Sequence, residues 1–184
     1  MTHDVLIGAR PEAQANASPR IASLDRAWIA ARIPHSGTMC LLERVEGWDQ
    51  TYIRCTATSH RNAHNPLRSR GRLATVCGIE YAAQAMALHG ALMSAQDDAA
   101  LTRPRVGYLA SVRGVEASIA RLDTFDAPLI VEAERVNGDG NTILYGFTVR
   151  CGDAVLLRGR AAVMLDASAA QAHTEDKTFK GDPT

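Results

Sequence analysis

The sequence predicts an α+β fold in which a curved antiparallel sheet wraps around one apolar helix. Three observations lead to this prediction. Residues 78–94 (GIEYAAQAMALHGALMS) are apolar almost all the way round, as in a helix that lies inside a protein. Two strand-like runs precede this segment, and about four runs with a two-residue period follow it. Such segregation of helix and strands is typical of the α+β class.

Before the apolar helix, the chain reads as a short helix followed by a hairpin. Ser23 to Arg32 has a helical pattern, with Ser23 as a candidate cap. The sequence Ile33-Pro34-His35-Ser36-Gly37 then breaks that helix. We expect Met39 to Trp48 to form a strand and Tyr52 to Thr58 to be its hairpin partner.

After the apolar helix, alternating apolar residues indicate strands. They identify 129–133, 143–149 and 157–165, and turn signals bound a further candidate at 105–119. Asn137-Gly138-Asp139-Gly140 has the chemistry of a hairpin turn between the first two of these strands. The second half of the chain is therefore expected to form most of the sheet.

Composition and flanking segments set limits on function. We expect residues 1–21 to be a flexible arm without a signal peptide, 22–165 to be the folded domain and 166–184 to be a disordered tail. The 20 basic and 20 acidic residues balance, which argues against nucleic-acid binding, and no run is long and apolar enough to span a membrane. The 4 cysteines lack metal-site spacing, so we expect reduced thiols, a cytoplasmic location and no metal or cofactor.

Polar residues interrupt the apolar helix near its start. Glu80 lies in the first turn, and Gln84 lies four residues on, on the same face. Glu80 can be read as a carboxylate favoured by the helix dipole, or as a carboxyl group enclosed by the sheet and suited to proton donation. Gln84 is either a satisfied buried amide or the group that holds Glu80 in place.

Four histidines compete as partners for that carboxyl group. His64 is favoured because it lies shortly before the helix, whose first N–H groups can polarise a carbonyl. His35 is expected to pack or hydrogen-bond locally after Ile33-Pro34, and His60 carries no further signal. His89 lies more than two helical turns from the carboxyl group, too far to share one reacting centre.

Three motifs, at residues 33–45, 78–85 and 107–113, occur in an order that resembles the hot-dog dehydratases of fatty-acid and polyketide synthesis, in particular the dehydratase-like proteins of aryl-polyene gene clusters. Residues 33–45 resemble a Leu-Pro-His turn that leads into a Leu-Leu-Asp-Arg-Val-like strand. Residues 78–85 (GIEYAAQA) resemble the central-helix motif, and 107–113 (GYLASVR) resemble the strand after it. The resemblance covers 22–165 and implies a hot-dog fold, assembled as a homodimer or a dimer of dimers.

The resemblance also implies a reaction, the loss of water from a 3-hydroxyacyl thioester on acyl-carrier protein or coenzyme A. In the family a histidine is the base and a glutamate from the other subunit is the acid, which gives these roles to His64 and Glu80. The loop His64-Asn65-Pro66-Leu67 departs from the family's His-Phe-Pro-Gly, and the family's oxyanion glycine falls at Thr75. The expected oxyanion and substrate-binding residues are Thr75, Val76 and Gln84.

Two other functions remain open. A hot-dog thioesterase would use Glu80 to activate water and would not need His64. A non-catalytic acyl-binding or assembly subunit would keep the pocket and the dimer surface without chemistry, and the missing loop glycine favours it. A DNA-binding hot-dog regulator is not expected, because the first 32 residues leave little room for a recognition module and are not basic.

A group of arginines near His64 predicts a docking surface for an acidic carrier. Guanidinium groups suit phosphate and carboxylate recognition, and these lie where a phosphopantetheine arm would enter. The alternative is a solvated loop without a partner. The residues are Arg61, Arg68, Arg70 and Arg72.

Overall fold

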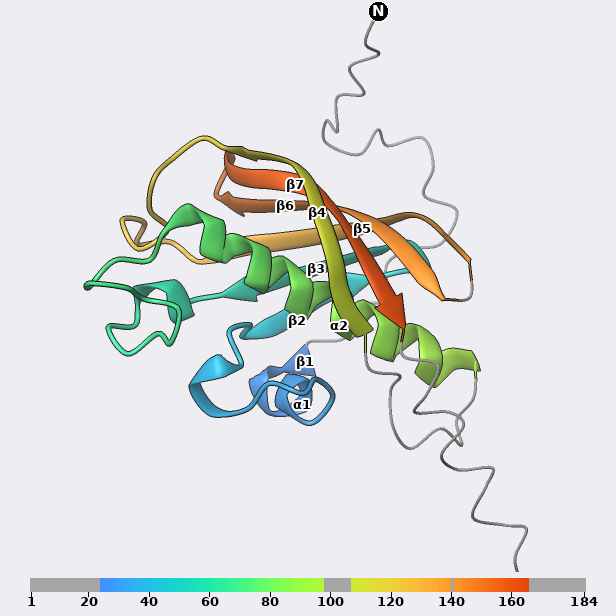
Figure 1. Cartoon of the computed structure of the whole chain (residues 1–184). Helices are drawn as coiled ribbons and strands as arrows, with labels where there is room; N and C mark the ends of the chain where they lie inside the picture. Colours follow the sequence, from blue (N-terminus) through green and yellow to red (C-terminus); the bar gives the residue numbers. More distant parts are fainter. Residues whose placement is uncertain (1–23, 98–106, 140, 166–184) are drawn as a thin grey trace, which may run out of the picture.

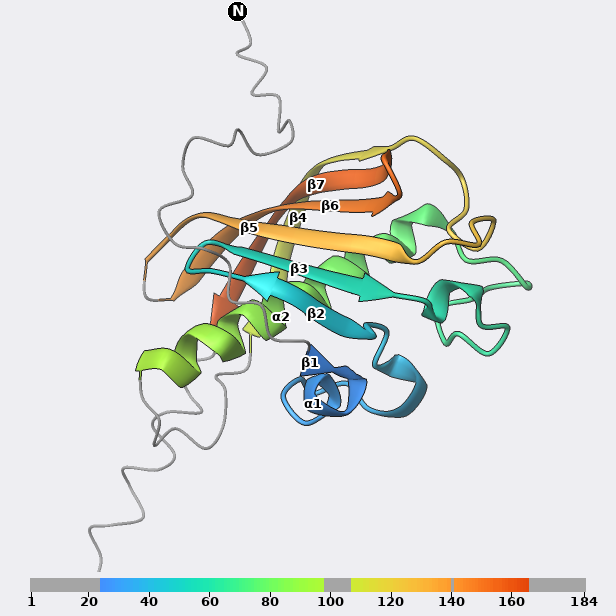
Figure 2. The ribbon, with the colours of Figure 1, turned by 180° about the vertical axis from the view of Figure 1, so that it is seen from behind.

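A long helix lies across one face of a curved antiparallel sheet in the computed structural model (Figures 1 and 2). The structure describes residues 24–97, 107–139 and 141–165, so the arm and the tail expected at 1–21 and 166–184 lie outside it. No helix in the described ranges is both long and apolar enough to cross a membrane. The predicted α+β architecture is confirmed.

The central helix, α2, runs over Gly78–Asp97 and confirms the predicted buried helix. It packs tightly at its start, because a Cβ atom on Gly78 would lie 2.8 Å from Leu157 Cδ2. Glycine there lets the helix approach the sheet closely. Farther along, the side chains that face the sheet are fully buried; they are Tyr81, Ala82, Ala85 and Leu88.

The described residues form a seven-stranded sheet in the order β1-β2-β3-β5-β6-β7-β4, with every neighbouring pair antiparallel. The sequence predicts two strands before the helix and about four after it, and the additional strand is a two-residue segment that pairs at one edge of the sheet. The strands are β1 Leu24–Asp25, β2 Arg44–Trp48, β3 Tyr52–Ala57, β4 Gly107–Ala117, β5 Leu129–Asp139, β6 Thr142–Cys151 and β7 Ala154–Leu165.

The strand register builds the core that supports α2. Cys55 of β3 lies opposite Val131 of β5, Val131 lies opposite Val149 of β6, and Val149 lies opposite Leu157 of β7. All four side chains are fully buried and form one apolar row across the sheet. Since this row ends at the residue that contacts Gly78, it fixes where α2 begins relative to the sheet.

The first helix is shorter than predicted. Helix α1 covers only Arg26–Ala30, and its N-cap is Asp25, whose side chain accepts a hydrogen bond from Trp28 N at 2.9 Å. Ser23 is therefore not the cap. Leu24 and Asp25 pair with β2 instead, so the chain is extended where the sequence pattern suggested helix.

Two further boundaries differ from prediction. The strand expected from Met39 begins only at Arg44, because Gly37–Met39 forms a 3₁₀ turn, η2. The expected turn residues Asn137 to Asp139 belong to β5 and pair with β6, so the reversal falls after Asp139. Two other 3₁₀ turns, η3 Ser59–Arg61 and η4 Thr75–Cys77, lie before α2.

Candidate active site

The Glu80 carboxyl group lies in the first turn of α2 and is approached from two sides. Gln84 Nε2 donates a hydrogen bond to Glu80 Oε1 at 3.0 Å, and His35 Nε2 lies 3.1 Å from the same oxygen. The side chains of His35 and Glu80 are 28% and 31% exposed, so a small molecule can reach both. One carboxyl oxygen is thus held, and the other has no partner among the described residues.

Gln84 connects α2 to the turn that carries His35. The fully buried amide donates from Nε2 to Met39 O at 2.8 Å and accepts at Oε1 from Leu41 N at 2.9 Å. Both sequence-based interpretations of Gln84 therefore hold, because it is a satisfied buried amide and it also contacts Glu80. These bonds explain why residues 39–41 do not pair as a strand.

The contact between His35 and Glu80 corrects the expectation that His35 would pack or hydrogen-bond locally. The chain turns at Gly37, which has a φ of +57°, and Gln84 then binds the following residues against α2. His35 Nδ1 is buried and has no hydrogen-bond partner within the described part of the chain. The sequence indicates a turn at residues 34–37, but a turn motif does not predict where the His35 ring points.

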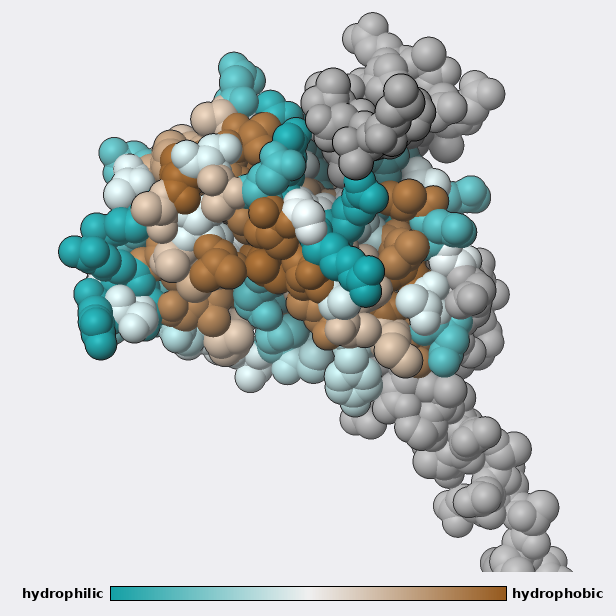
Figure 3. Space-filling model, turned by 45° about the horizontal axis from the view of Figure 1, so that its top comes forward, coloured by the Kyte–Doolittle hydropathy of each residue, from teal (hydrophilic) through white to brown (hydrophobic). Residues whose placement is uncertain are grey.

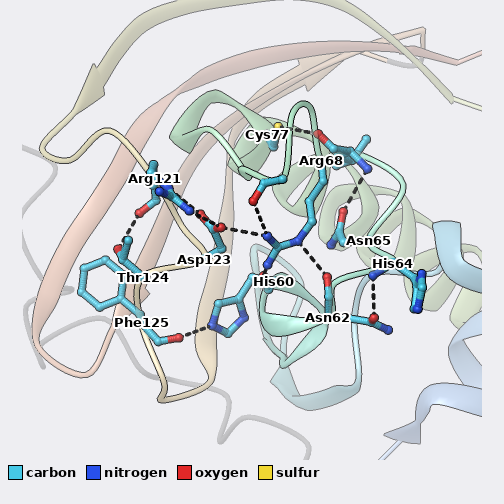
Figure 4. A network of polar contacts seen from close by, with 12 residues as sticks. His60, Asn62, His64, Asn65, Arg68, Cys77, Arg121, Asp123, Thr124 and Phe125 are labelled. Atoms are coloured by element: carbon cyan, nitrogen blue, oxygen red, sulfur yellow. Dashed lines mark hydrogen bonds and ion pairs between the residues drawn. The ribbon is translucent and has the colours of Figure 1, made fainter.

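The expected pairing of His64 with Glu80 is not seen within one chain. His64 is exposed, and only its backbone N–H is bound, by Asn62 Oδ1 at 2.8 Å (Figure 4). The family resemblance assigns the two residues to different subunits, so one chain cannot test their pairing. The role of His64 across an interface remains a prediction.

Of the two amides predicted to bind the substrate carbonyl, Thr75 is already occupied. Its N–H donates to Ala120 O at 3.1 Å, and its hydroxyl donates to Ile119 O at 2.8 Å. The prediction for Thr75 is wrong, because the loop after β4 uses this amide. Val76, the next residue, is 60% exposed, and its N–H has no acceptor among the described residues, so it is the remaining candidate.

Arg68 is not a free surface cation, which corrects its predicted role in docking. Its side chain is 14% exposed and binds the carboxylate of Asp123 at 2.8 Å (Figure 4). The Arg68 guanidinium group donates three further hydrogen bonds, which hold the surrounding loop. Their acceptors are the backbone oxygens of His60, Asn62 and Gly71.

Asp123 is the buried anchor of this network, with a side chain that is 3% exposed. Arg121 donates to both of its carboxylate oxygens, at 3.0 and 2.7 Å. These hydrogen bonds keep the pKa of Asp123 well below its ordinary value. The network therefore joins the loop before α2 to the loop after β4 through paired charges.

The other three arginines differ in how free they are. Arg61 is exposed, but it donates to Asp126 O at 2.6 Å. Arg70 and Arg72 are exposed, and their side chains have no partner among the described residues. Arg70 has a φ of 52°, in a tight left-handed turn with Gly71. Only these last two remain uncommitted cations for a docking surface.

His60 and His89 are buried and bind within the fold. His60 Nε2 lies 3.0 Å from Phe125 O, and His89 lies 2.9 Å from the Tyr145 hydroxyl. Burial lowers the pKa of both histidines. Neither is a free partner for Glu80. The cysteines are free thiols, and the described residues contain no group of three side chains that could hold a metal ion.

Comparisons with known proteins fit this arrangement. The family model described as ApeP dehydratase matches residues 27–174. No curated protein matches the chain. Among solved structures, the dehydratase heterocomplex ApeI:P from Xenorhabdus doucetiae is similar with a TM-score of 0.67 and 20% identity, covering 81% of this chain and 97% of that one.

A weaker likeness joins the chain to a thioesterase, HI1161 from Haemophilus influenzae. The TM-score is 0.49 and the identity is 13%, over 68% of this chain and 78% of that one. The similarity to the Xenorhabdus structure confirms the predicted hot-dog fold.

Proposed function

Because this chain belongs to the ApeP-like dehydratase family, we propose that it removes water from a 3-hydroxyacyl thioester on acyl-carrier protein, in aryl-polyene or related fatty-acid or polyketide synthesis. The supporting observation is the Glu80 carboxyl group. It is partly exposed at the start of the central helix and is held through one oxygen. Elimination needs such a group, because protons must be moved at a defined position.

The N–H of Val76 is the proposed donor to the thioester carbonyl. It lies at the N-terminal end of α2, and a negative charge that develops on the carbonyl oxygen is favoured by the helix dipole. Removal of the α-proton places such charge on that oxygen. Glu80 and this amide then supply the two functions that the elimination requires, proton transfer and charge stabilisation.

Product analysis tests this proposal. The chain, alone and with any subunit it requires, is incubated with a 3-hydroxyacyl carrier-protein thioester. We expect the enoyl thioester, and we expect Glu80→Gln to slow its formation by roughly 10²–10⁴-fold, because the isosteric amide cannot take up or release the proton. Free acid as the product would mean a thioesterase, and an unchanged thioester would mean a binding subunit.

We also propose that a second copy of the chain pairs with the edge strand β4, giving a homodimer or a dimer of dimers. This strand ends the sheet and is exposed along most of its 11 residues, which leaves a row of backbone groups open to pairing. Tyr108, Leu109 and Val115 are exposed apolar residues on it. Figure 3 shows apolar residues gathered on the face seen when the top of Figure 1 is tilted forward.

Light scattering tests the assembly. We expect at least a dimer at micromolar concentration and a shift toward monomer in Leu109→Lys/Val115→Lys, because charges would be buried in the joined edge. The similar Xenorhabdus protein is part of a heterocomplex. If the protein is a monomer on its own and assembles only with a second, related chain, a heterocomplex replaces the homodimer in this proposal.

For the carrier, we propose that Arg70 and Arg72 form the core of the docking surface, with Arg61 beside them. Their exposure and their charge suit encounter with the surface of an acidic carrier protein. A cytoplasmic location fits the four free thiols and the substrate that we propose.

A further inference from the structure

The loop that carries His64 is held on both sides of that residue. Before it, Asn62 Oδ1 accepts from the His64 N–H and Asn62 O accepts from Arg68 Nε, both at 2.8 Å. After it, Asn65 Oδ1 accepts from Leu67 N at 3.0 Å. The His64 ring is exposed, has no partner among the described residues and points away from the Arg68 network (Figure 4). The backbone is therefore fixed, while the ring is free to act on another molecule.

Asn65, the next residue, is directed into the protein and is only 5% exposed. Its Nδ2 donates to Ser59 O at 3.0 Å and to the Tyr81 hydroxyl at 2.9 Å. Ser59 belongs to η3 and Tyr81 to α2, so one amide joins the loop to both elements. Breaking these bonds would leave buried polar groups unpaired, which is costly. The amide therefore anchors the loop beside its free histidine.

The hydrogen bonds that leave Asn65 run in one direction. Ser59 Oγ donates its single proton to Leu41 O at 2.7 Å. The contact of 2.9 Å between Ser59 Oγ and the Tyr81 hydroxyl is then donated by Tyr81, which accepts from Asn65. Burial raises the pKa of Tyr81 above its ordinary value, so the hydroxyl keeps the proton that this order needs. The Tyr81 hydroxyl is thus the central link, as both an acceptor and a donor.

The same series of bonds continues to the Glu80 carboxyl group. Leu41 donates its N–H to Gln84 Oε1 at 2.9 Å, and Gln84 Nε2 donates to Glu80 Oε1 at 3.0 Å. His64 and Glu80 of one chain are therefore connected through the fold, although their side chains do not meet. The family resemblance gives these two residues to different subunits at each site, so within one chain they belong to two different sites.

We propose that Asn65 and Tyr81 are positioning residues of the dehydration, which hold the His64 loop so that its ring reaches a substrate bound beside Glu80 of a second subunit. The proposal rests on the proposed dehydration and on the role of base that the resemblance gives to His64. It also gives a reason for the unusual loop sequence. Asn65 stands where the family's His-Phe-Pro-Gly has phenylalanine, and here a buried amide supplies the anchor.

Tyr81→Phe tests the proposal in the intact assembly, with the enoyl product as the readout. It takes the shared partner from Asn65 Nδ2 and Ser59 Oγ, so we expect kcat to fall roughly 10-fold with little change in KM. Tyr145→Phe is the matched control, because it removes a buried hydroxyl that binds His89 in the second half of α2. Its kcat should stay within about twofold of the parent protein.

Asn65→Asp is a second variant of nearly the same shape. It keeps the acceptor for Leu67 N but replaces the Nδ2 donor with an oxygen that faces Ser59 O and the Tyr81 hydroxyl. We expect a loss in kcat at least as large as that of Tyr81→Phe. Full activity in Asn65→Asp overturns the role of Asn65. Rates are compared at a temperature at which thermal unfolding shows every variant to be folded.

A double substitution separates positioning of His64 from general support of the fold. In His64→Ala the ring is already absent, so adding Tyr81→Phe should change kcat by less than about twofold. The same roughly 10-fold loss in both backgrounds, or no loss in either, overturns the proposal. A His64→Ala protein as active as the parent overturns the role of base on which the proposal rests. A parent protein that makes no enoyl product overturns the proposed function, which an active parent with independent losses does not.

Discussion

Two loops flank the start of α2, and each carries a histidine, but they use their polar groups differently. The turn of residues 33–41 directs its contacts at α2, through Gln84 and Glu80. The loop of residues 59–72 contacts α2 through Asn65 and the Tyr81 hydroxyl, but its arginine Arg68 binds within the loop and to the buried Asp123. We call the site formed by the first loop with Glu80 and Gln84 the reactive corner, and the network of Arg68, Arg121 and Asp123 the frame. His64 of the second loop is exposed.

This difference shows what a cluster of charged residues means. The arginine-rich loop looked like a binding surface, yet the guanidinium group of Arg68 donates hydrogen bonds to four acceptors within the fold. The turn around His35 has few charges and looked structural, yet its ring reaches a carboxyl group 45 residues away. Availability of a charge, and not its density along the sequence, decides whether it can act on another molecule.

The largest effect on stability is expected in the frame. Arg68→Met leaves Asp123 with one arginine partner instead of two and removes three bonds to backbone oxygens, so we expect a loss of about 3 kcal/mol in the free energy of unfolding. Arg72→Met is the matched control, and its exposed side chain should change stability by less than about 0.5 kcal/mol. Equal losses, measured by denaturant unfolding, would mean that the network does not support the loop.

A smaller loss is expected at the reactive corner. Gln84→Leu removes the partners of Leu41 N and Met39 O, and we expect about 2 kcal/mol of destabilisation by denaturant unfolding. It should also lower dehydration, because Glu80 loses a donor. Gln50→Leu, on an exposed residue, is the control. A stable Gln84→Leu protein with full activity would show that the amide does not fix Glu80.

The frame also predicts an effect of acid. Because the folded-state pKa of Asp123 is depressed, its stabilising contribution is present above the unfolded value near 3.8 and is lost as pH falls through the lower folded value. Asp123→Asn should be less stable than the parent at neutral pH by about 1–2 kcal/mol, and the gap should narrow below about pH 4. Thermal unfolding across that range measures it; a gap that does not change with pH would exclude this carboxylate as the cause.

The smallest effect concerns the two arginines that remain uncommitted. In Arg70→Glu/Arg72→Glu we expect a several-fold loss with a carrier-bound substrate and no loss with a short N-acetylcysteamine thioester, because exposed charges act on encounter with the carrier. The loss should shrink as salt rises, since such charges are screened beyond about 8–10 Å. An equal loss on both substrates would place these residues in the site and not on a docking surface.

Periodicity alone predicted the parts of the fold that burial dictates. The helix from Gly78 is largely buried, and the strands with a two-residue period are buried on the face that their pattern indicated. Short local elements were missed, because long-range bonds decide them. Gln84 draws residues 39–41 away from β2, and an edge pairing makes Asp25, not Ser23, the cap of α1.

The candidate site was predicted only in part for the same reason. Glu80 and Gln84 follow from helical spacing, which a sequence displays directly. The state of the Thr75 amide depends on Ala120, and the position of His35 depends on a turn at Gly37. Neither partner is close in the sequence to the helix that carries Glu80, so no spacing rule connects them.

Hydration of an enoyl thioester in D₂O tests the central claim most directly, because it reports the proton transfer at Cα. We expect the assembled protein to form the 3-hydroxyacyl thioester with one deuterium at Cα, and Glu80→Gln to do so at least about 100-fold more slowly. Free acid without deuterium at Cα, or equal rates for the two proteins by mass spectrometry, would contradict a dehydratase that works through Glu80.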